Sequence, residues 1–213
     1  MRTEDLIKLL ASNADAEKID SAARRFAWAL GAGALSTALL MLATLGVNPA
    51  LAHFVSLPAF WMKAIFVAAL AGIGLKAVLR LSRPGVDLGR VPFALAIPVS
   101  MMWAIAIAVL VLAAPTERAE AFLGRTWTVC PFLIAMLSVP VFAGVIWAMN
   151  GLAPTRSRMS GAAAGFLSGA VGALVYCLHC PELSPPFIAF WYLLGVLIPT
   201  GIGALLGKRL LQW

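Results

Sequence analysis

Residues 91–114 read VPFALAIPVSMMWAIAIAVLVLAA, a run that contains no charged side chain. A helix needs about 20 such residues to cross the hydrocarbon core of a bilayer. Similar apolar runs lie on both sides of it, and the predicted spans are 26–46, 59–79, 91–114, 127–149, 160–178 and 187–207. The alternating pattern of a membrane β-barrel is absent from the sequence. We therefore predict an all-α, polytopic membrane protein with a bundle of six transmembrane helices.

The composition supports this class and argues against several others. Hydrophobic residues make up 62% of the chain and charged residues 12%, against about 45–50% and about 25% in soluble domains. The sequence contains no phosphate-binding glycine loop, no HExxH motif and no Ser/His/Asp arrangement. The predicted spans carry no acidic residue, which ion-coupled transporters usually need. We predict neither an enzyme nor a bound cofactor.

The positive charge predicts the orientation of the bundle. If the spans alternate in direction, most basic residues fall on one side of the membrane: Arg2, Lys8, Lys18, Arg24, Arg25, Lys76, Arg80, Arg83, Arg90, Arg156, Arg158, Lys208 and Arg209. The other side has only Lys63, Arg118 and Arg125. Basic residues are enriched on the cytoplasmic side of membrane proteins. Both termini are therefore expected in the cytoplasm, and the net charge of +7 does not indicate a nucleic-acid partner.

The chain divides into a cytoplasmic segment, 1–25, and a six-helix transmembrane domain, 26–213. The first segment is polar and of mixed charge, unlike a signal peptide, so the first span is expected to stay in the mature protein. Thr3 could cap a short helix whose apolar stripe is Leu6, Ile7, Leu9 and Leu10. Such a helix is too short to be stable alone. It would order against a partner protein or on the membrane surface.

Two cysteines are candidate sensor residues. Cys130 and Cys180 are each followed by proline, and both fall at the outer ends of predicted spans, where we expect the thiols to meet the periplasm. Disulfides form and persist in that compartment. Three interpretations stay open: a static disulfide, a pair that responds to oxidants or metals, and unpaired buried cysteines.

Cys177 and His179 lie beside Cys180 in the sequence and allow two further kinds of thiol chemistry, a Cys-x-x-Cys redox pair and a metal site. Cys177 and Cys180 form a nominal Cys-x-x-Cys motif, but it closes a predicted helix, where the helix dipole favours the protonated thiol. Cys177 also continues a stripe of small residues, which favours a packing role. His179 is the third candidate sensor residue, and it could act as a local base or a metal ligand. With Cys130, Cys177 and Cys180 it would make a closed four-ligand site, although the spacing is not a recognised one.

Other residues predict packing and anchoring. Gly161, Gly165, Gly169 and Ala173 recur every four residues, as do Gly195, Pro199, Gly203 and Gly207, so the last two spans are expected to pack closely. Lys63, in the second span, could be functional or could extend its ammonium group outward to the interface. An interaction between Lys63 and Glu182 is a further alternative. Trp61, Trp127, Trp191 and Tyr192 are expected in an outer interfacial belt, and Trp28, Trp147 and Trp213 in an inner one.

Five short segments resemble the NrsF family: Arg2-Thr-Glu-Asp-Leu-Ile7, Phe60-Trp-Met-Lys63, Thr126-Trp-Thr-Val-Cys-Pro131, Ala153-Pro-Thr155 and His179-Cys-Pro-Glu182. Members of this family are six-span negative regulators of an extracytoplasmic-function (ECF) sigma factor, sigma-F. The resemblance covers essentially the whole chain, and the Cys-Pro elements are its most specific part.

The resemblance implies an anti-sigma factor of the bacterial inner membrane. It implies that residues 1–25 hold the ECF sigma factor and that Cys130 and Cys180 take part in sensing, whereas Cys177 does not belong to the family pattern. Oxidative or heavy-metal stress would then release the sigma factor, with Cys130 and Cys180 as the candidate metal-binding thiols. The alternative function is a membrane thiol-disulfide oxidoreductase coupled to quinone, with Cys177 and Cys180 as the reactive pair. A small-solute permease is a third class.

Overall fold

The computed structural model describes residue 4 and residues 16–211 except residue 153. The elements in chain order are α2 (Ala16–Thr44), α3 (Leu51–Val55), α4 (Pro58–Leu81), α5 (Val91–Leu112), α6 (Pro115–Leu123), α7 (Cys130–Asn150), α8 (Ser157–Tyr176), α9 (Pro185–Phe187), a π-helical turn η1 (Ile188–Tyr192) and α10 (Leu193–Leu210). No strand occurs within the described part of the chain. Among the described residues, six helical stretches are long and apolar enough to cross a membrane. The predicted all-α fold and the six helices of membrane-spanning length are confirmed.

Prolines set the starts of most of these helices. Each of α4, α5, α6, α7 and α9 has a proline in its first two positions. The fixed φ of proline suits a first helical turn, and its missing N–H is not needed there. The predicted span 127–149 therefore begins three residues later, at Cys130. The last span is longer than predicted, since α9, η1 and α10 together form one span, Pro185–Leu210.

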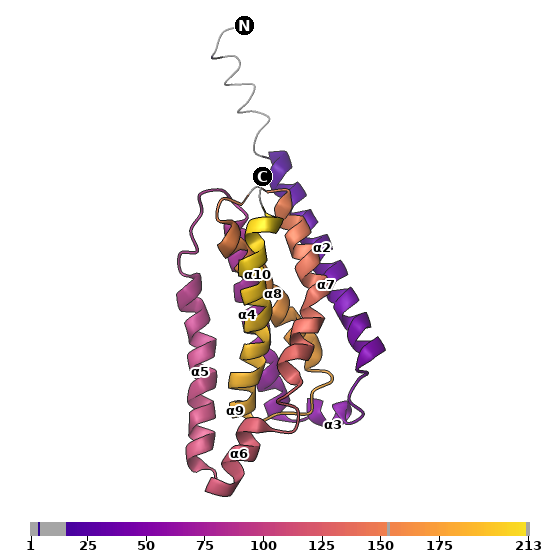
Figure 1. The fold of residues 1–213 in the computed structure, drawn as a ribbon, viewed down its shortest axis with the longest axis vertical. Coiled ribbons are helices and arrows are strands. Elements are labelled where there is room, and N and C mark those ends of the chain that lie inside the picture. Colours follow the sequence, from indigo (N-terminus) through magenta and orange to yellow (C-terminus); the bar gives the residue numbers. More distant parts are fainter. Residues whose placement is uncertain (1–3, 5–15, 153, 212–213) are drawn as a thin grey trace.

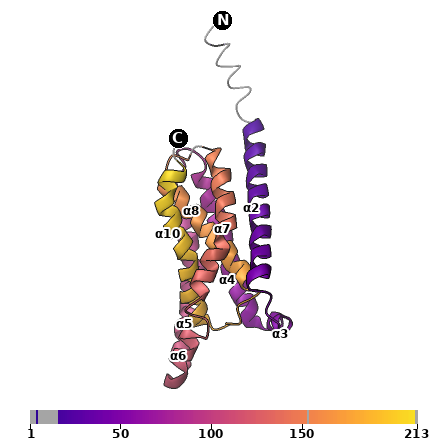
Figure 2. The ribbon, with the colours of Figure 1, turned by 45° about the vertical axis from the view of Figure 1, so that its right-hand side comes forward.

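Helix α8 is the central helix of the bundle. It packs against α10, α4 and α7, while α2 packs mainly on α7. Helices α2 and α5 lie at opposite edges in Figure 1, and Figure 2 again places α2 on the outside. Of α5, only Met102 and Ala106 are buried. The core of the protein therefore lies around α8, and α5 is the most peripheral of the long helices.

The expected close approach of the last two spans is confirmed. A Cβ atom built at Gly165 of α8 would lie 2.9 Å from the Cα of Thr200 in α10 and still closer to the Pro199 carbonyl. At Gly161 it would meet the backbone of Gly203. Real Cβ contacts are not this short, so only glycine lets these two backbones touch.

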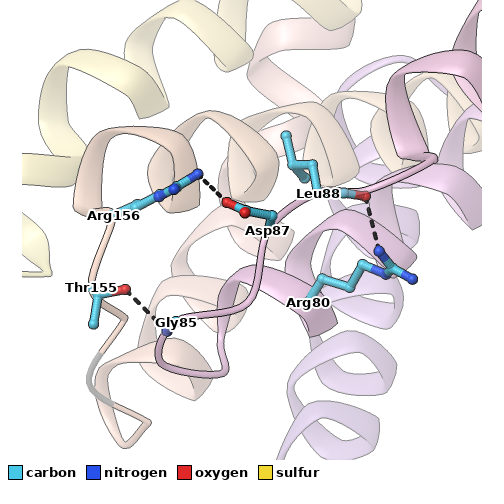
Figure 3. Close-up of polar contacts among 6 residues, drawn as sticks. All are labelled: Arg80, Gly85, Asp87, Leu88, Thr155 and Arg156. Atoms are coloured by element: carbon cyan, nitrogen blue, oxygen red, sulfur yellow. Dashed lines mark hydrogen bonds and ion pairs between the residues drawn. The ribbon is translucent and has the colours of Figure 1, made fainter.

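The bundle has two distinct ends. The basic end contains the start of α2, the α4–α5 loop, the α7–α8 loop and the end of α10; the thiol end contains α3, α6, α9 and the α8–α9 connection (Figure 1). At the basic end, Arg156 pairs with Asp87, the Gly85 N–H donates to Thr155, and Arg80 donates to the Leu88 carbonyl (Figure 3). The first two contacts join the α4–α5 loop to the α7–α8 loop, and the third holds the α4–α5 loop against the end of α4.

One expectation from the sequence cannot be compared with the structure, and another is wrong. The apolar stripe predicted for the N-terminal segment, Leu6, Ile7, Leu9 and Leu10, lies outside the described residues. Tyr192 does not belong to an interfacial belt, because it is fully buried. The π-helical turn inserts an extra residue into the helix, and Tyr192 comes to lie in the core beside Tyr176 and Phe187. Trp61 and Trp127, by contrast, are exposed at the thiol end.

Candidate thiol site

The three cysteines gather at the thiol end but do not face solvent. Cys130 is the first residue of α7, Cys177 follows the last turn of α8, and Cys180 lies in the connection to α9. Their exposed fractions are 0%, 3% and 2%, and all three are free thiols. The expectation that Cys130 and Cys180 meet the periplasm directly is wrong. They belong to the same buried hydrophobic cluster as Tyr176 and Tyr192, so a reagent can reach the sulfurs only when this packing opens.

Cys130 and Cys180 are neighbours whose thiols influence each other's ionisation. Hydrogen bonding from Cys130 lowers the pKa of the Cys180 thiol, the positive charge of Lys63 also lowers it, and burial opposes both effects. The thiolate is the form that attacks oxidants and binds metals. The lowered pKa therefore favours the thiolate form of Cys180.

Cys177 has a different environment. Its Sγ donates to the carbonyl of Ala173, one turn earlier in α8, at 3.3 Å. This contact is local to the helix that carries it. The contact does not involve Cys180, so it gives no reason to prefer Cys177 over Cys130 as the partner of Cys180.

Cys180 lies in the short connection from α8 to α9; we call residues 178–184 of this connection the outer strap. His179 Nδ1 lies 3.0 Å from the Gly46 carbonyl, and Asn48 Nδ2 donates to the His179 carbonyl at 3.2 Å. At the other end, the Arg125 N–H donates to the Glu182 carboxylate at 2.8 Å. The strap is thus fastened to the α2–α3 loop on one side and to the α6–α7 loop on the other.

Lys63 fastens the middle of the outer strap. Its side chain is fully buried, and its ammonium group donates to the carbonyls of Cys180, at 2.9 Å, and Glu182, at 3.0 Å. It also lies over the rings of Phe60 and Tyr192. Lys63 therefore does not extend to the interface. Lys63 does contact Glu182, as the sequence suggested, but it donates to the backbone carbonyl of Glu182 and not to its carboxylate.

We predict that Lys63→Met loosens the outer strap. Charged hydrogen bonds contribute about 2 kcal/mol each, and methionine leaves the carbonyls of Cys180 and Glu182 without their donor. Cys180 should then react faster with N-ethylmaleimide, measured by mass spectrometry of the intact protein in detergent. Lys76→Met is the matched control, because Lys76 lies exposed in the same helix. An unchanged alkylation rate in Lys63→Met would show that Lys63 does not hold the strap.

The four-ligand metal site is not formed. Within the described residues, no three His, Cys, Asp or Glu side chains gather in a way that could hold a metal ion. The ring of His179 bonds to the Gly46 carbonyl through Nδ1 and stacks near Tyr176. Through Nδ1, His179 thus contacts the α2–α3 loop. The pair of Cys130 and Cys180 stays as the candidate for a thiophilic metal.

Tyr192 is a member of the site that the sequence analysis missed. Its hydroxyl is fully buried, influences the ionisation of Cys177 and Cys180, and makes no regular hydrogen bond within the described residues. The sequence signal was present but ambiguous: a tyrosine after Trp191 at a helix end is typical of an interfacial belt. The π-helical turn at Ile188–Tyr192 instead places the Tyr192 side chain in the core.

Helix α7 connects the thiol site to the first span. Thr37 of α2 donates to the Leu137 carbonyl at 3.0 Å, in the buried interior. Nearer the basic end, Arg25 donates to the Trp147 carbonyl at 2.7 Å and lies over the ring of Trp147 at 4.4 Å. A Cβ on Gly144 would approach the Ala29 carbonyl at 2.9 Å. Helix α7 therefore contacts α2 directly, and the first residues of α2, from Ala16, belong to the predicted N-terminal segment 1–25.

Comparison with known proteins gives a consistent result. Residues 10–213 match the model of a family described as NrsF, negative regulator of sigma F. The chain is 58% identical to a probable anti-sigma-F factor NrsF of Azospira oryzae and 40% identical to the anti-sigma-F factor NrsF of Caulobacter vibrioides, in each case over the full length of both chains. No solved structure matches the chain.

Proposed function

Because the chain belongs to the NrsF family of negative regulators of sigma F, we propose that it is a membrane-embedded anti-sigma factor controlled by thiols. In the resting state its N-terminal segment holds an ECF sigma factor at the cytoplasmic face of the inner membrane. Modification of Cys130 and Cys180, on the periplasmic side, releases that factor. The six membrane-length helices and the excess of basic residues at one end support this orientation.

One observation carries the thiol part of the proposal: Cys130 is the first residue of α7, and α7 packs along α2. Cys180, its neighbour, belongs to the outer strap and not to the same helix. A bond between the two sulfurs would therefore pull the start of α7 against the strap. Helix α2 begins at Ala16, within the N-terminal segment 1–25, so a shift of α7 reaches the sigma-binding end of the chain.

The chemistry of the switch balances with a hydroperoxide as the oxidant. The Cys180 thiolate attacks the peroxide, the O–O bond breaks, and a sulfenic acid forms as the alkoxide leaves and takes up a proton. The Cys130 thiol then attacks that sulfur, which releases water and forms the disulfide. A thiophilic divalent metal would act on the same pair by displacing two protons and binding both thiolates.

The required coupling is of ordinary size. A signal acts on binding only by shifting the balance between two conformations that differ in affinity for the partner. A coupling of about 3 kcal/mol changes affinity roughly 150-fold, at the upper end of typical allosteric systems. Buried thiols suit such a switch, because the packed interior has few intermediate arrangements.

Deletion of residues 1–14 tests the anti-sigma part. We expect the truncated protein to insert into the membrane normally and to capture none of its sigma factor in a co-purification assay, since the apolar stripe is lost. A finer test is Leu6→Asp with Leu10→Asp, matched by Lys8→Gln with Ser12→Ala on the predicted opposite face. Full capture by the truncated protein would place the docking surface elsewhere and contradict this part, without bearing on the thiol chemistry.

A further inference from the structure

The basic end carries a cavity that the anti-sigma mechanism does not use. It has a volume of about 550 Å³ and lies between the last turns of α4, the α4–α5 loop and the start of α5. This size is within the range of about 300–1,000 Å³ that is usual for small-molecule sites. Its polar walls are Lys76, Arg80, Arg83 and Arg90, and its other walls are Leu79, Val86, Val91 and Ala94.

The cavity has no acidic wall to balance its four cations. Asp87, the acidic residue of the same loop, is turned toward the α7–α8 loop and pairs with Arg156 (Figure 3). Lys76, Arg83 and Arg90 make no side-chain hydrogen bond or ion pair with any described residue. Four cations that share one cavity repel one another, so the cavity is suited to an anion.

Local geometry holds one of these cations in place. Arg80 donates to the Leu88 carbonyl at 3.1 Å, which leaves other N–H groups of its guanidinium available. Gly89 has a φ of +55°, and a Cβ there would collide with that guanidinium. The loop is thus shaped around Arg80. A signal for membrane orientation needs positive charge in the loop, but it does not need a shaped cavity.

The depth of the site indicates where its ligand comes from. Lys76 lies five residues before the end of α4, or about 7.5 Å along a helix with a rise of about 1.5 Å per residue. This depth corresponds to the headgroup boundary of the bilayer. From the cavity toward the thiol end, α5 has an exposed apolar row at four-residue intervals: Phe93, Ile97 and Met101. Acyl chains can lie along this exposed apolar row while a headgroup occupies the cavity.

We propose that this cavity binds the phosphate headgroup of an anionic phospholipid. The cations pair with the phosphodiester, and the apolar walls contact the glycerol backbone and the first methylenes. Basic pockets between transmembrane helices on the cytoplasmic side commonly bind anionic lipids. The inference rests on the membrane location under Proposed function and is independent of the thiol switch.

Native mass spectrometry of the full-length protein tests this site, with phosphatidylglycerol as the probe and phosphatidylcholine as the zwitterionic comparison. We expect one phosphatidylglycerol to stay bound to the unmodified protein and phosphatidylcholine to be lost. Arg83→Gln with Arg90→Gln should weaken retention roughly thirtyfold, since two cationic contacts are removed. Lys208→Gln with Arg209→Gln removes the same charge from the same end outside the cavity, and it should retain the lipid.

Each other outcome would overturn the proposal. Equal retention of both lipids, or equal loss in both double variants, would mean that no built site exists. Full displacement of the lipid by millimolar inorganic phosphate would assign the cavity to a free anion. If the Arg83/Arg90 variant kept its lipid but lost sigma-factor capture, the cavity would belong to a protein interface. Thermal unfolding of both variants in detergent checks that each remains folded.

Discussion

Replacing both Cys130 and Cys180 with serine is expected to give a protein that captures its sigma factor normally and never releases it. The pair is the only place in the proposed switch where the inducing chemistry occurs, so the response should fall to the background level and not merely weaken. The measurement is transcription from a sigma-F-dependent promoter before and after exposure to hydroperoxide or to a thiophilic metal. Each single variant should behave like the double variant, since one thiol cannot form the bridge.

Cys177→Ser is the matched control for this experiment. Cys177 is as buried as the other two cysteines, and its thiol bonds within α8. We expect this variant to keep the full response. An alanine pair at 130 and 180 separates loss of sensing from the cost of burying two hydroxyl groups. A normal response in the double serine variant would refute the thiol switch, and loss of response in Cys177→Ser alone would favour the oxidoreductase-type pair.

Gly165→Leu is expected to cause the largest loss of stability of any single change considered. A Cβ at this position already conflicts with the backbone of Pro199 and Thr200, and backbone atoms cannot rotate away as a side chain can. Overpacking costs about 1–3 kcal/mol in a typical core, and separating α8 from α10 would place this variant at or above the upper value. The measurement is the thermal unfolding midpoint in detergent, together with the amount of protein in the membrane.

Gly201→Leu is the matched control, because Gly201 lies in α10 with no atom near its hypothetical Cβ. The same substitution there should change the midpoint little. Both variants add the same apolar volume to a helix, so a difference between them reports the α8–α10 contact alone. Similar midpoints for the two variants would contradict the packing described here.

The fold was largely predictable because its determinants are local. The length and apolarity of each run set the six spans, since a backbone in hydrocarbon must satisfy its own hydrogen bonds within a helix. The α8–α10 contact was also predictable from a local pattern, because glycines at four-residue intervals place small residues on one face of a helix. The boundaries moved where proline fixed a first turn, as at Cys130 in α7 and Pro185 in α9.

The two thiols of the candidate site were singled out from the sequence, but their environment and the place of Tyr192 beside them were not. The adjacent prolines and the span ends marked Cys130 and Cys180, but the same pattern placed them in solvent, whereas they are buried. Cys180 belongs to the outer strap, which is fastened by residues far away in the sequence, among them Asn48 and Lys63. A pattern read along one segment contains no information about such partners.

The sequence by itself thus determined the six long apolar helices, which end is basic and which thiols are candidates. Only the tertiary structure decided that Lys63 bonds to backbone carbonyls of the outer strap, that Tyr192 turns inward, and that Asp87 leaves four cations unbalanced. The physical reason is that hydrophobicity and helix formation depend on neighbouring residues, whereas burial, ion pairing and hydrogen-bond partners depend on which distant segments meet.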